Sequence, residues 1–231
     1  MKDILIIVPA YNEQDSVEGV IDELESYSEY DYVIVNDGST DRTEDICKAR
    51  GANIISLPLN LGIGGAVQTG YKYAHKYGYK YAVQFDGDGQ HDASYISTLI
   101  KAAQETESNM VIGSRFIDVS EGDFQSTKMR RVGICLISSC IRLFSKLTVS
   151  DPTSGFRLCD EKVIELFCRD YPADYPEPES IVSVHSRGLR ISDAPVKMRE
   201  RQGGTSSIKA FSSVVYMVKV LTAILIRSSR K

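Results

Sequence analysis

The sequence predicts an α/β domain built on a mostly parallel sheet with helices on both faces. In the first half of the 231-residue chain, short apolar and β-branched runs alternate with segments whose apolar residues recur at helical spacing. Each run ends in polar or acidic residues, as strands of an open parallel sheet do at their ligand-binding ends. The length fits one domain of ordinary size, and the alternation favours crossover connections between parallel strands.

The elements follow in order along the chain. Residues 4–8 and 32–35 are the first two predicted strands, and apolar positions at helical spacing within residues 13–26 predict the helix between them. Asp41, with Glu44 three residues later, is typical of the cap of a second helix. The alternation continues with strands at residues 53–57, 80–85 and 110–112 and helices at residues 65–76 and 93–103.

Beyond residue 115 the alternation ends. Residues 128–146 predict a long helix, residues 160–168 a short helix, and residues 171–178 a proline-rich extended stretch. We expect this half to be an elaboration of the same domain on one side of its ligand site.

Composition limits the classes of function. The net charge of −4 and the pI near 5.5 provide no basic footprint, which argues against a nucleic-acid partner and for a small ligand. The five cysteines include no Cys-x-x-Cys pair, so we expect reduced thiols in a cytoplasmic protein. The apolar run before Pro9 is too short for the core of a signal peptide.

A pair of carboxylates follows the fourth predicted strand. Asp86 and Asp88 are two residues apart, so in an extended segment both side chains point the same way and can share a hard divalent cation with a diphosphate. Gly87 between them lets a backbone approach closely. The alternative is an ordinary acidic turn.

Other polar residues follow the earlier strands. Tyr11 and Glu13 come after the first strand and Asp37 after the second. Asp37 is either a turn former or helix cap, or an acceptor for a base N–H or a ribose hydroxyl. The glycines around Gly64 match neither the dinucleotide fingerprint nor a Walker loop, and they favour a helix that starts close to a ligand.

Three segments carry arginines among small and polar residues. Residues 113–115 end at Arg115, residues 151–157 end at Arg157, and residues 199–206 include Arg201. We expect these segments to be electropositive and flexible, with guanidinium forks suited to phosphate oxygens. For each one alone, a solvated surface arginine is the alternative.

Four segments in this order resemble family 2 glycosyltransferases, within the branch of dolichyl- and polyprenyl-phosphate sugar synthases. They are Pro9-Ala-Tyr-Asn-Glu13, Val35-Asn-Asp37-Gly-Ser39, Asp86-Gly-Asp88-Gly-Gln90-His91 and Asp151-Pro-Thr-Ser-Gly155-Phe-Arg157. The resemblance covers about residues 3–207 and implies a type A glycosyltransferase fold. It also implies an inverting transfer from a nucleoside-diphosphate sugar, with a UDP-hexose or UDP-N-acetylhexosamine as the expected donor.

The resemblance also implies roles for single residues. Asp86, Asp88 and Gln90 would hold Mg²⁺ or Mn²⁺ against the diphosphate, while Arg115 and Arg157 would face the transferring sugar or the acceptor phosphate. The expected nucleotide-sugar site comprises Pro9, Tyr11, Glu13, Asp37, Gly64, Asp86, Gly87, Asp88, Arg201 and Ser206. The branch usually has a lysine where this chain has Ser207, which weakens the assignment to a lipid-phosphate acceptor.

Two acceptors and one non-enzymatic function remain open. The expected acceptor is polyprenyl (undecaprenyl) phosphate, whose second pKa of about 6 leaves a nucleophilic oxygen without a general base. A saccharide hydroxyl of a lipid-linked or cell-surface polysaccharide would need a base, and Glu177 or Glu179 is the nearest candidate. A nucleotide-sugar-binding subunit without catalysis would use the same residues.

The carboxy terminus predicts a separate helix. We divide the chain into a catalytic domain at residues 1–207 and a helical appendage at residues 208–231. The apolar stretch at 210–226 spans about 25 Å as a helix, which is short for a bilayer. It therefore predicts a helix lying in the inner face of the cell membrane or bound to a small membrane partner or a second copy. The alternative is a helix packed on the protein's own core.

Overall fold

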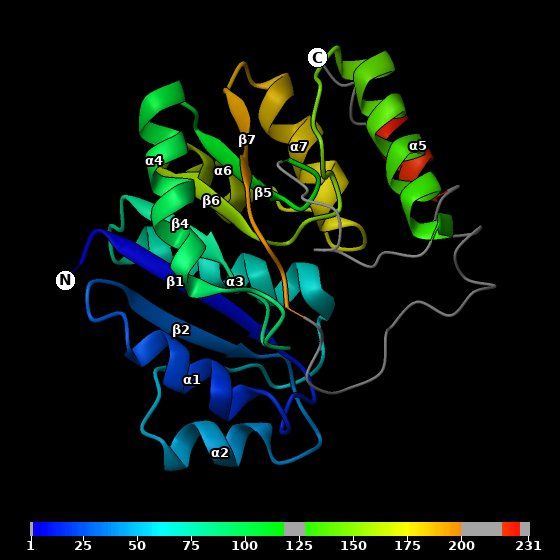
Figure 1. The fold of residues 1–231 in the computed structure, drawn as a ribbon. Coiled ribbons are helices and arrows are strands. Elements are labelled where there is room, and N and C mark those ends of the chain that lie inside the picture. The colour runs from blue at the N-terminus through cyan, green and yellow to red at the C-terminus, as the bar shows by residue number, and fades with distance from the viewer. Residues whose placement is uncertain (1, 118–127, 200–218, 227–231) are drawn as a thin grey trace.

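A seven-stranded sheet with the strand order β3-β2-β1-β4-β6-β5-β7 forms the centre of the computed structural model, which describes residues 2–117, 128–199 and 219–226 (Figure 1). Parallel pairs join β1 to β2 and β4, β2 to β3, and β5 to β7. Of the seven strands described, only β6 runs antiparallel, between β4 and β5. The predicted mostly parallel sheet is confirmed. The strands are β1 (Ile4–Ala10), β2 (Asp31–Asn36), β3 (Ile54–Ser56), β4 (Tyr81–Gln84), β5 (Met110–Ser114), β6 (Arg157–Asp160) and β7 (Ile191–Pro195).

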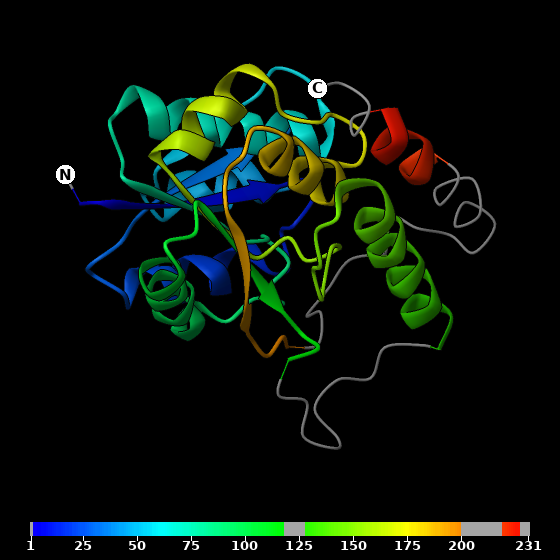
Figure 2. The same ribbon diagram turned by 90° about the horizontal axis from the view of Figure 1, so that it is seen from above.

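Helices cover both faces of this sheet. In Figure 2, α3 and α6 lie on one face, and α1 and α4 lie on the other. Alternate residues of β1 pack into the two layers, with Leu5 and Ile7 on the α3 side and Ile6 and Val8 on the α1 side. Burial on both faces explains why the strands read as continuous apolar runs. The helices are α1 (Val17–Glu25), α2 (Thr43–Ala49), α3 (Gly62–Lys76), α4 (Ile96–Thr106), α5 (Lys128–Ser145), α6 (Glu161–Arg169) and α7 (Pro176–Ser186).

Helix α7 corrects the expected extended stretch at residues 171–178. It begins at Pro176, and Pro178 also lies in its first turn. Proline fits there because the first N–H groups of a helix have no partner within the helix, and its fixed φ is already helical. The two prolines therefore mark the start of a helix and do not exclude one.

Strands β6 and β7 were not expected from the sequence. β6 begins at Arg157, a charged residue that is only 1% exposed. β7 has the sequence Ile-Ser-Asp-Ala-Pro, which contains too few apolar residues to predict a strand. Polar side chains of both strands bond to distant segments, Arg157 to Glu177 O and Asp193 Oδ2 to Ser150.

Residues 219–226 form a short helix whose Val220 and Ile224 are fully buried in the same core as α3, α6 and α7. This part of the predicted carboxy-terminal helix packs on the domain, while residues 208–218 of the appendage lie outside the described residues. Among the helices described, none is both long enough and apolar enough to cross a bilayer. The in-plane membrane helix stays a prediction.

Candidate active site

The loops that follow β1, β2 and β4 meet at one edge of the sheet. β1 lies between β2 and β4, so the strand order reverses direction at the β1–β4 boundary. In open α/β sheets ligands bind outside the carboxyl ends of the strands at such a reversal. The loops with Tyr11 and Glu13 and with Asp86 and Asp88 flank this boundary, as the sequence predicted.

The β1 and β2 loops are tied together by hydrogen bonds. Asn12 N donates to Ser39 Oγ at 3.0 Å, and Glu13 N donates to Thr43 Oγ1 at 2.9 Å. Asn12 has a φ of 56°, a left-handed conformation that is costly for a residue with a side chain and that the surrounding bonds maintain. The strained loop presents the ring of Tyr11, which is 46% exposed, at the strand ends.

Asp37 is buried and already has a structural partner. Its Oδ1 accepts a hydrogen bond from Leu61 N at 2.7 Å, and burial raises the pKa of its carboxyl. This bond to Oδ1 is the kind expected of a turn-forming or capping aspartate, which is the alternative that the sequence left open. A contact to the nucleoside stays a prediction.

Gly64 contacts the loop between α6 and α7. A Cβ at this position would lie 2.4 Å from Pro172 O and 2.5 Å from Ala173 O, both backbone atoms. The absence of a side chain lets the loop pack directly on the first turn of α3. This packing gives Gly64 a structural role close to the site, while its contact to a nucleotide sugar stays a prediction.

The loop with Asp86 and Asp88 is held by bonds from several elements. Asp88 Oδ1 accepts from Gln90 N at 3.0 Å, and Ser16 Oγ donates to Gly87 O at 2.8 Å. Gln90 O accepts from Arg199 N at 2.8 Å, which ties the segment after β7 to this loop. The backbone around the two carboxylates is therefore positioned before any ligand binds.

His91 supports this loop from inside the core. It is 1% exposed, and its ring stacks on Phe156 with centroids 4.8 Å apart. Burial, with a smaller contribution from Arg115, lowers the pKa of His91 to about 4. The neutral ring accepts a hydrogen bond at Nδ1 from Asp86 N at 2.9 Å, so this nitrogen is occupied in positioning the loop.

Arg115 forms a buried ion pair with Asp151. Its Nε lies 2.6 Å from Asp151 Oδ2, and one terminal nitrogen lies 2.8 Å from Asp151 Oδ1. The Asp151 side chain is fully buried and that of Arg115 is 5% exposed. This two-pronged contact joins the end of β5 to the loop before β6.

Arg157 is fully buried and bonds mainly to backbone carbonyls. It donates to Ser154 O at 2.7 Å, to Glu177 O at 2.7 Å and to Ser180 Oγ at 2.6 Å. Arg115 and Arg157 are therefore both buried and hydrogen-bonded within the protein, so the alternative of a solvated surface arginine does not hold for either of them. Whether either arginine also acts on a ligand stays a prediction.

Glu177 and Glu179 lie in the first turn of α7 and not in the extended loop expected for them. Glu177 has a perturbed carboxyl. Partial burial and the Asp86 carboxylate raise its pKa, and Arg157 opposes this shift. A carboxyl of raised pKa beside the loop with Asp86 and Asp88, here called the acidic loop, is a candidate general base.

Sequence reasoning missed Gln84 and Gly155. Gln84 is the last residue of β4 and is 1% exposed, and a Cβ on Gly155 would lie 3.1 Å from its Nε2. A polar residue that ends an apolar strand directly before an acidic loop was the available signal. Two predicted residues, Arg201 and Ser206, lie outside the described part of the chain.

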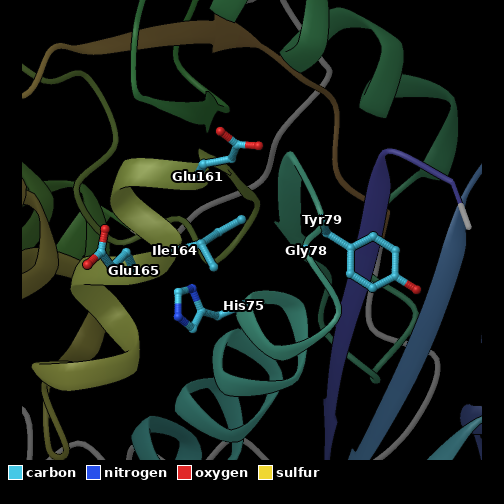
Figure 3. A pocket seen from close by; sticks show the side chains of 6 residues that line it. All are labelled: His75, Gly78, Tyr79, Glu161, Ile164 and Glu165. Atoms are coloured by element: carbon cyan, nitrogen blue, oxygen red, sulfur yellow. The ribbon is translucent and has the colours of Figure 1, made fainter.

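A pocket of about 250 Å³ lies away from these residues (Figure 3). Its lining side chains include His75 at the end of α3 and Glu161 at the start of α6, and Tyr79 precedes β4. This is the amino-terminal edge of β4, opposite the acidic loop. It is therefore not the site that the sequence predicted.

Comparison with known proteins gives the family and the fold. The family model for Glycosyl transferase family 2 matches residues 5–167. The UDP-N-acetylglucosamine–dolichyl-phosphate N-acetylglucosaminyltransferase of Methanococcus voltae is 29% identical over 84% of this chain and 84% of its own length. The undecaprenyl-phosphate mannosyltransferase of Micrococcus luteus is 27% identical over 89% of this chain and 87% of its own length.

A solved structure shares the fold. Glucosyl-3-phosphoglycerate synthase from Mycobacterium tuberculosis, crystallised with Mn²⁺, UDP and phosphoglyceric acid, superimposes with a TM-score of 0.75. The match covers 99% of this chain and 79% of the synthase at 18% sequence identity. The fold expected from the resemblance, a type A glycosyltransferase sheet flanked by helices, agrees with this match.

Proposed function

The chain belongs to glycosyl transferase family 2, and on this basis we propose that it transfers a hexose or an N-acetylhexosamine from a UDP-sugar to polyprenyl phosphate, with inversion at the sugar carbon. The observation that carries the proposal is the pair Asp86 and Asp88, in a hydrogen-bonded loop at the reversal of strand order. The relatives from Methanococcus voltae and Micrococcus luteus, named for transfer to dolichyl and undecaprenyl phosphate, support this acceptor class.

The acidic loop fits a divalent cation. Asp86 and Asp88 offer carboxylate oxygens, which Mg²⁺ and Mn²⁺ prefer, and the Asp86 side chain is 35% exposed and reachable from solvent. In the described residues there is no group of three or more His, Cys, Asp or Glu side chains that could hold a metal alone. The remaining ligands would come from Gln90, the donor diphosphate and water.

The transfer needs no proton transfer if the acceptor is a phosphate. An anionic phosphate oxygen attacks the anomeric carbon, the bond from that carbon to the diphosphate oxygen breaks, and UDP leaves with the electron pair. When bound, the cation supplies neutralisation of the charge that develops on the leaving diphosphate. Asp86 and Asp88 would hold the cation on the side of the donor diphosphate, and we assign contacts to the nucleoside to Pro9, Tyr11, Glu13 and Asp37.

The test is release of UDP from a panel of UDP- and GDP-sugars with Mn²⁺, in the presence and absence of polyprenyl phosphate. We expect release that requires the lipid phosphate and falls at least a hundredfold in Asp88→Asn, because the variant retains the shape of the loop and loses a charged ligand. Release of equal size without lipid phosphate, or from the variant, contradicts the proposal. Donor binding without release under any condition would point to a binding subunit.

A second candidate, transfer to a saccharide hydroxyl, is favoured by one observation. A hydroxyl must lose its proton, and the raised pKa of Glu177 beside Asp86 suits a general base. Glu177→Gln separates the two acceptors, because a hydroxyl acceptor predicts a loss of about a hundredfold or more in kcat and a phosphate acceptor predicts little change. Glu179→Gln, in the same helical turn, tests the other candidate base in the same way.

We further propose that the enzyme works peripherally on the cytoplasmic face of the membrane, in the assembly of cell-wall or surface polysaccharide. The outward side of α5 supports this proposal. Val132 and Leu143 are 66% and 72% exposed, and with Leu136 they recur at helical spacing on the side away from the buried Ile137. Residues 128–149 contain five Lys or Arg residues and no Asp or Glu, a composition that suits anionic lipid.

A further inference from the structure

Gln84 carries a buried N–H group that has no hydrogen-bond partner. The side-chain atom Nε2 is inaccessible to solvent and is one of few such atoms in the described residues. Buried donors are almost always paired, because an unpaired one keeps the full cost of leaving water. An unpaired donor beside a proposed ligand site therefore suggests a partner that arrives with the ligand.

The orientation of this amide follows from its other contact. Tyr171 OH donates to Gln84 Oε1 at 3.3 Å. Exchanging the two amide atoms would turn Oε1 toward the Asp86 carboxylate, where two acceptors would repel each other. Nε2 therefore faces the acidic loop, and Tyr171 fixes the opposite side of the amide.

Gly155 shows how near the amide is to the acidic loop. A Cβ on Gly155 would lie 3.0 Å from Asp86 Oδ2 and 3.1 Å from Gln84 Nε2. The two groups thus border the same small space, which the loop before β6 closes with a residue that has no side chain. A hydrogen bond from Gln84 Nε2 to the Asp86 carboxylate would form across this space.

We propose that Gln84 is a positioning residue for the cation–diphosphate site, and that its unpaired Nε2–H becomes the hydrogen-bond donor to Asp86 when Mn²⁺ and the nucleotide bind. The inference rests on one part of the proposed function, namely that this site binds a cation together with a nucleoside diphosphate. Such partners behind a metal ligand orient the ligand and raise the affinity for the metal. On this proposal, Gln84 Nε2 has no partner in the ligand-free protein because its hydrogen bond to Asp86 forms only in the ligand-bound protein.

Gln84→Met tests this role, since methionine has nearly the same shape and lacks the N–H. The change also removes the acceptor of Tyr171 OH, so the comparison is made in a Tyr171→Phe background. In that background, we expect Gln84→Met to weaken Mn²⁺ binding in the presence of UDP by about tenfold, measured by calorimetry. We expect the melting temperature of the ligand-free protein to stay the same or rise, because a buried unpaired donor is lost.

If Gln84 only stabilises the fold, Gln84→Met should lower the melting temperature and leave the affinity for Mn²⁺ unchanged. Lower melting temperature of the ligand-free protein with unchanged affinity for Mn²⁺ and UDP would overturn the inference and leave the proposed function intact. Failure of the native chain to bind Mn²⁺ and UDP would overturn both. Tyr171→Phe alone should change affinity less than the double variant, since it retains the Gln84 N–H.

Discussion

At the scale of single residues, a substitution of Arg115 tests whether this predicted catalytic arginine also stabilises the folded protein. Arg115→Ala would leave the Asp151 carboxylate, which is fully buried, without its counter-charge. We expect a loss of about 3–5 kcal/mol in the free energy of unfolding, measured in urea. Arg190→Ala is the matched control, because the pair of Arg190 with Glu107 is exposed and should cost less than about 1 kcal/mol. Equal costs for the two variants would contradict a structural role for Arg115.

Asp193 makes stability depend on pH. Burial raises the pKa of its carboxyl, while hydrogen bonds from Ser150 oppose the shift. Because the folded state holds the proton more tightly, the stabilising contribution is present at pH values below the ordinary pKa and is lost as the pH rises through the raised pKa.

Asp193→Asn should remove this dependence. We expect the free energy of unfolding of the variant, relative to the native chain, to improve as the pH rises from about 4 to 7. The measurement is urea unfolding of both proteins at several pH values. Parallel pH profiles would show that Asp193 does not titrate in this range.

The sequence predicted the position of the acidic residues at the sheet edge, but it did not predict the surroundings of the two arginines. Asp86 and Asp88 follow an apolar strand, so their position at the sheet edge followed from the strand alone. The partners of Arg115 and Arg157 are distant in sequence, at Asp151 and Glu177. Spacing cannot show which distant groups compensate a charge, and so the same motif suggested exposed cations.

At the scale of elements, the contact between α3 and the α6–α7 loop can be tested at Gly64. Alanine in a helix normally gains up to about 1 kcal/mol over glycine. At Gly64 the added Cβ would meet Pro172 O and Ala173 O, which are backbone atoms that cannot rotate away. We expect Gly64→Ala to lower the free energy of unfolding by about 1–3 kcal/mol, measured in urea. A more stable variant would show that the loop does not pack on α3 as described.

The outward side of α5 can be tested for binding to lipid. Leu136→Glu combined with Leu143→Glu should weaken sedimentation with vesicles containing anionic lipid by about tenfold or more, because charges replace exposed apolar side chains. Ser97→Glu on the exposed side of α4 is the control for an added negative charge. Unchanged sedimentation of the double variant would assign any membrane contact to another part of the chain.

Helices and strands were predicted correctly from the sequence where a helix has one apolar face or a strand is apolar on both faces. The strands β1 and β2 and helices α1 and α3 have patterns that burial dictates locally. Helix α7 was missed because its prolines were interpreted as extended chain, although proline at the first helical position is favourable. β7 was missed because its polar residues are compensated by contacts with distant segments, such as that between Asp193 and Ser150.

At the scale of the whole molecule, the order of the sheet could be predicted only in part. Alternation along the chain implied parallel neighbours such as β1 and β2. The insertion of β6 between β4 and β5 joins residues 81–84 to residues 157–160, a pairing that no local pattern encodes. This insertion brings the loop with Gly155 against Asp86, so the geometry of the site depends on a feature that was not predictable.

Because the site draws loops from strands on both sides of β1, ligand binding should stabilise the entire sheet. UDP and Mn²⁺ at about one hundred times their dissociation constant would add about 2.7 kcal/mol, or roughly 5–10 °C in melting temperature for a domain of this size. Asp88→Asn should melt near the native temperature without ligand and lose most of the shift, because its loop backbone is held by Ser16 and Arg199. A shift that survives in Asp88→Asn would place the nucleotide elsewhere, while a variant that melts early without ligand would show that Asp88 itself maintains the loop.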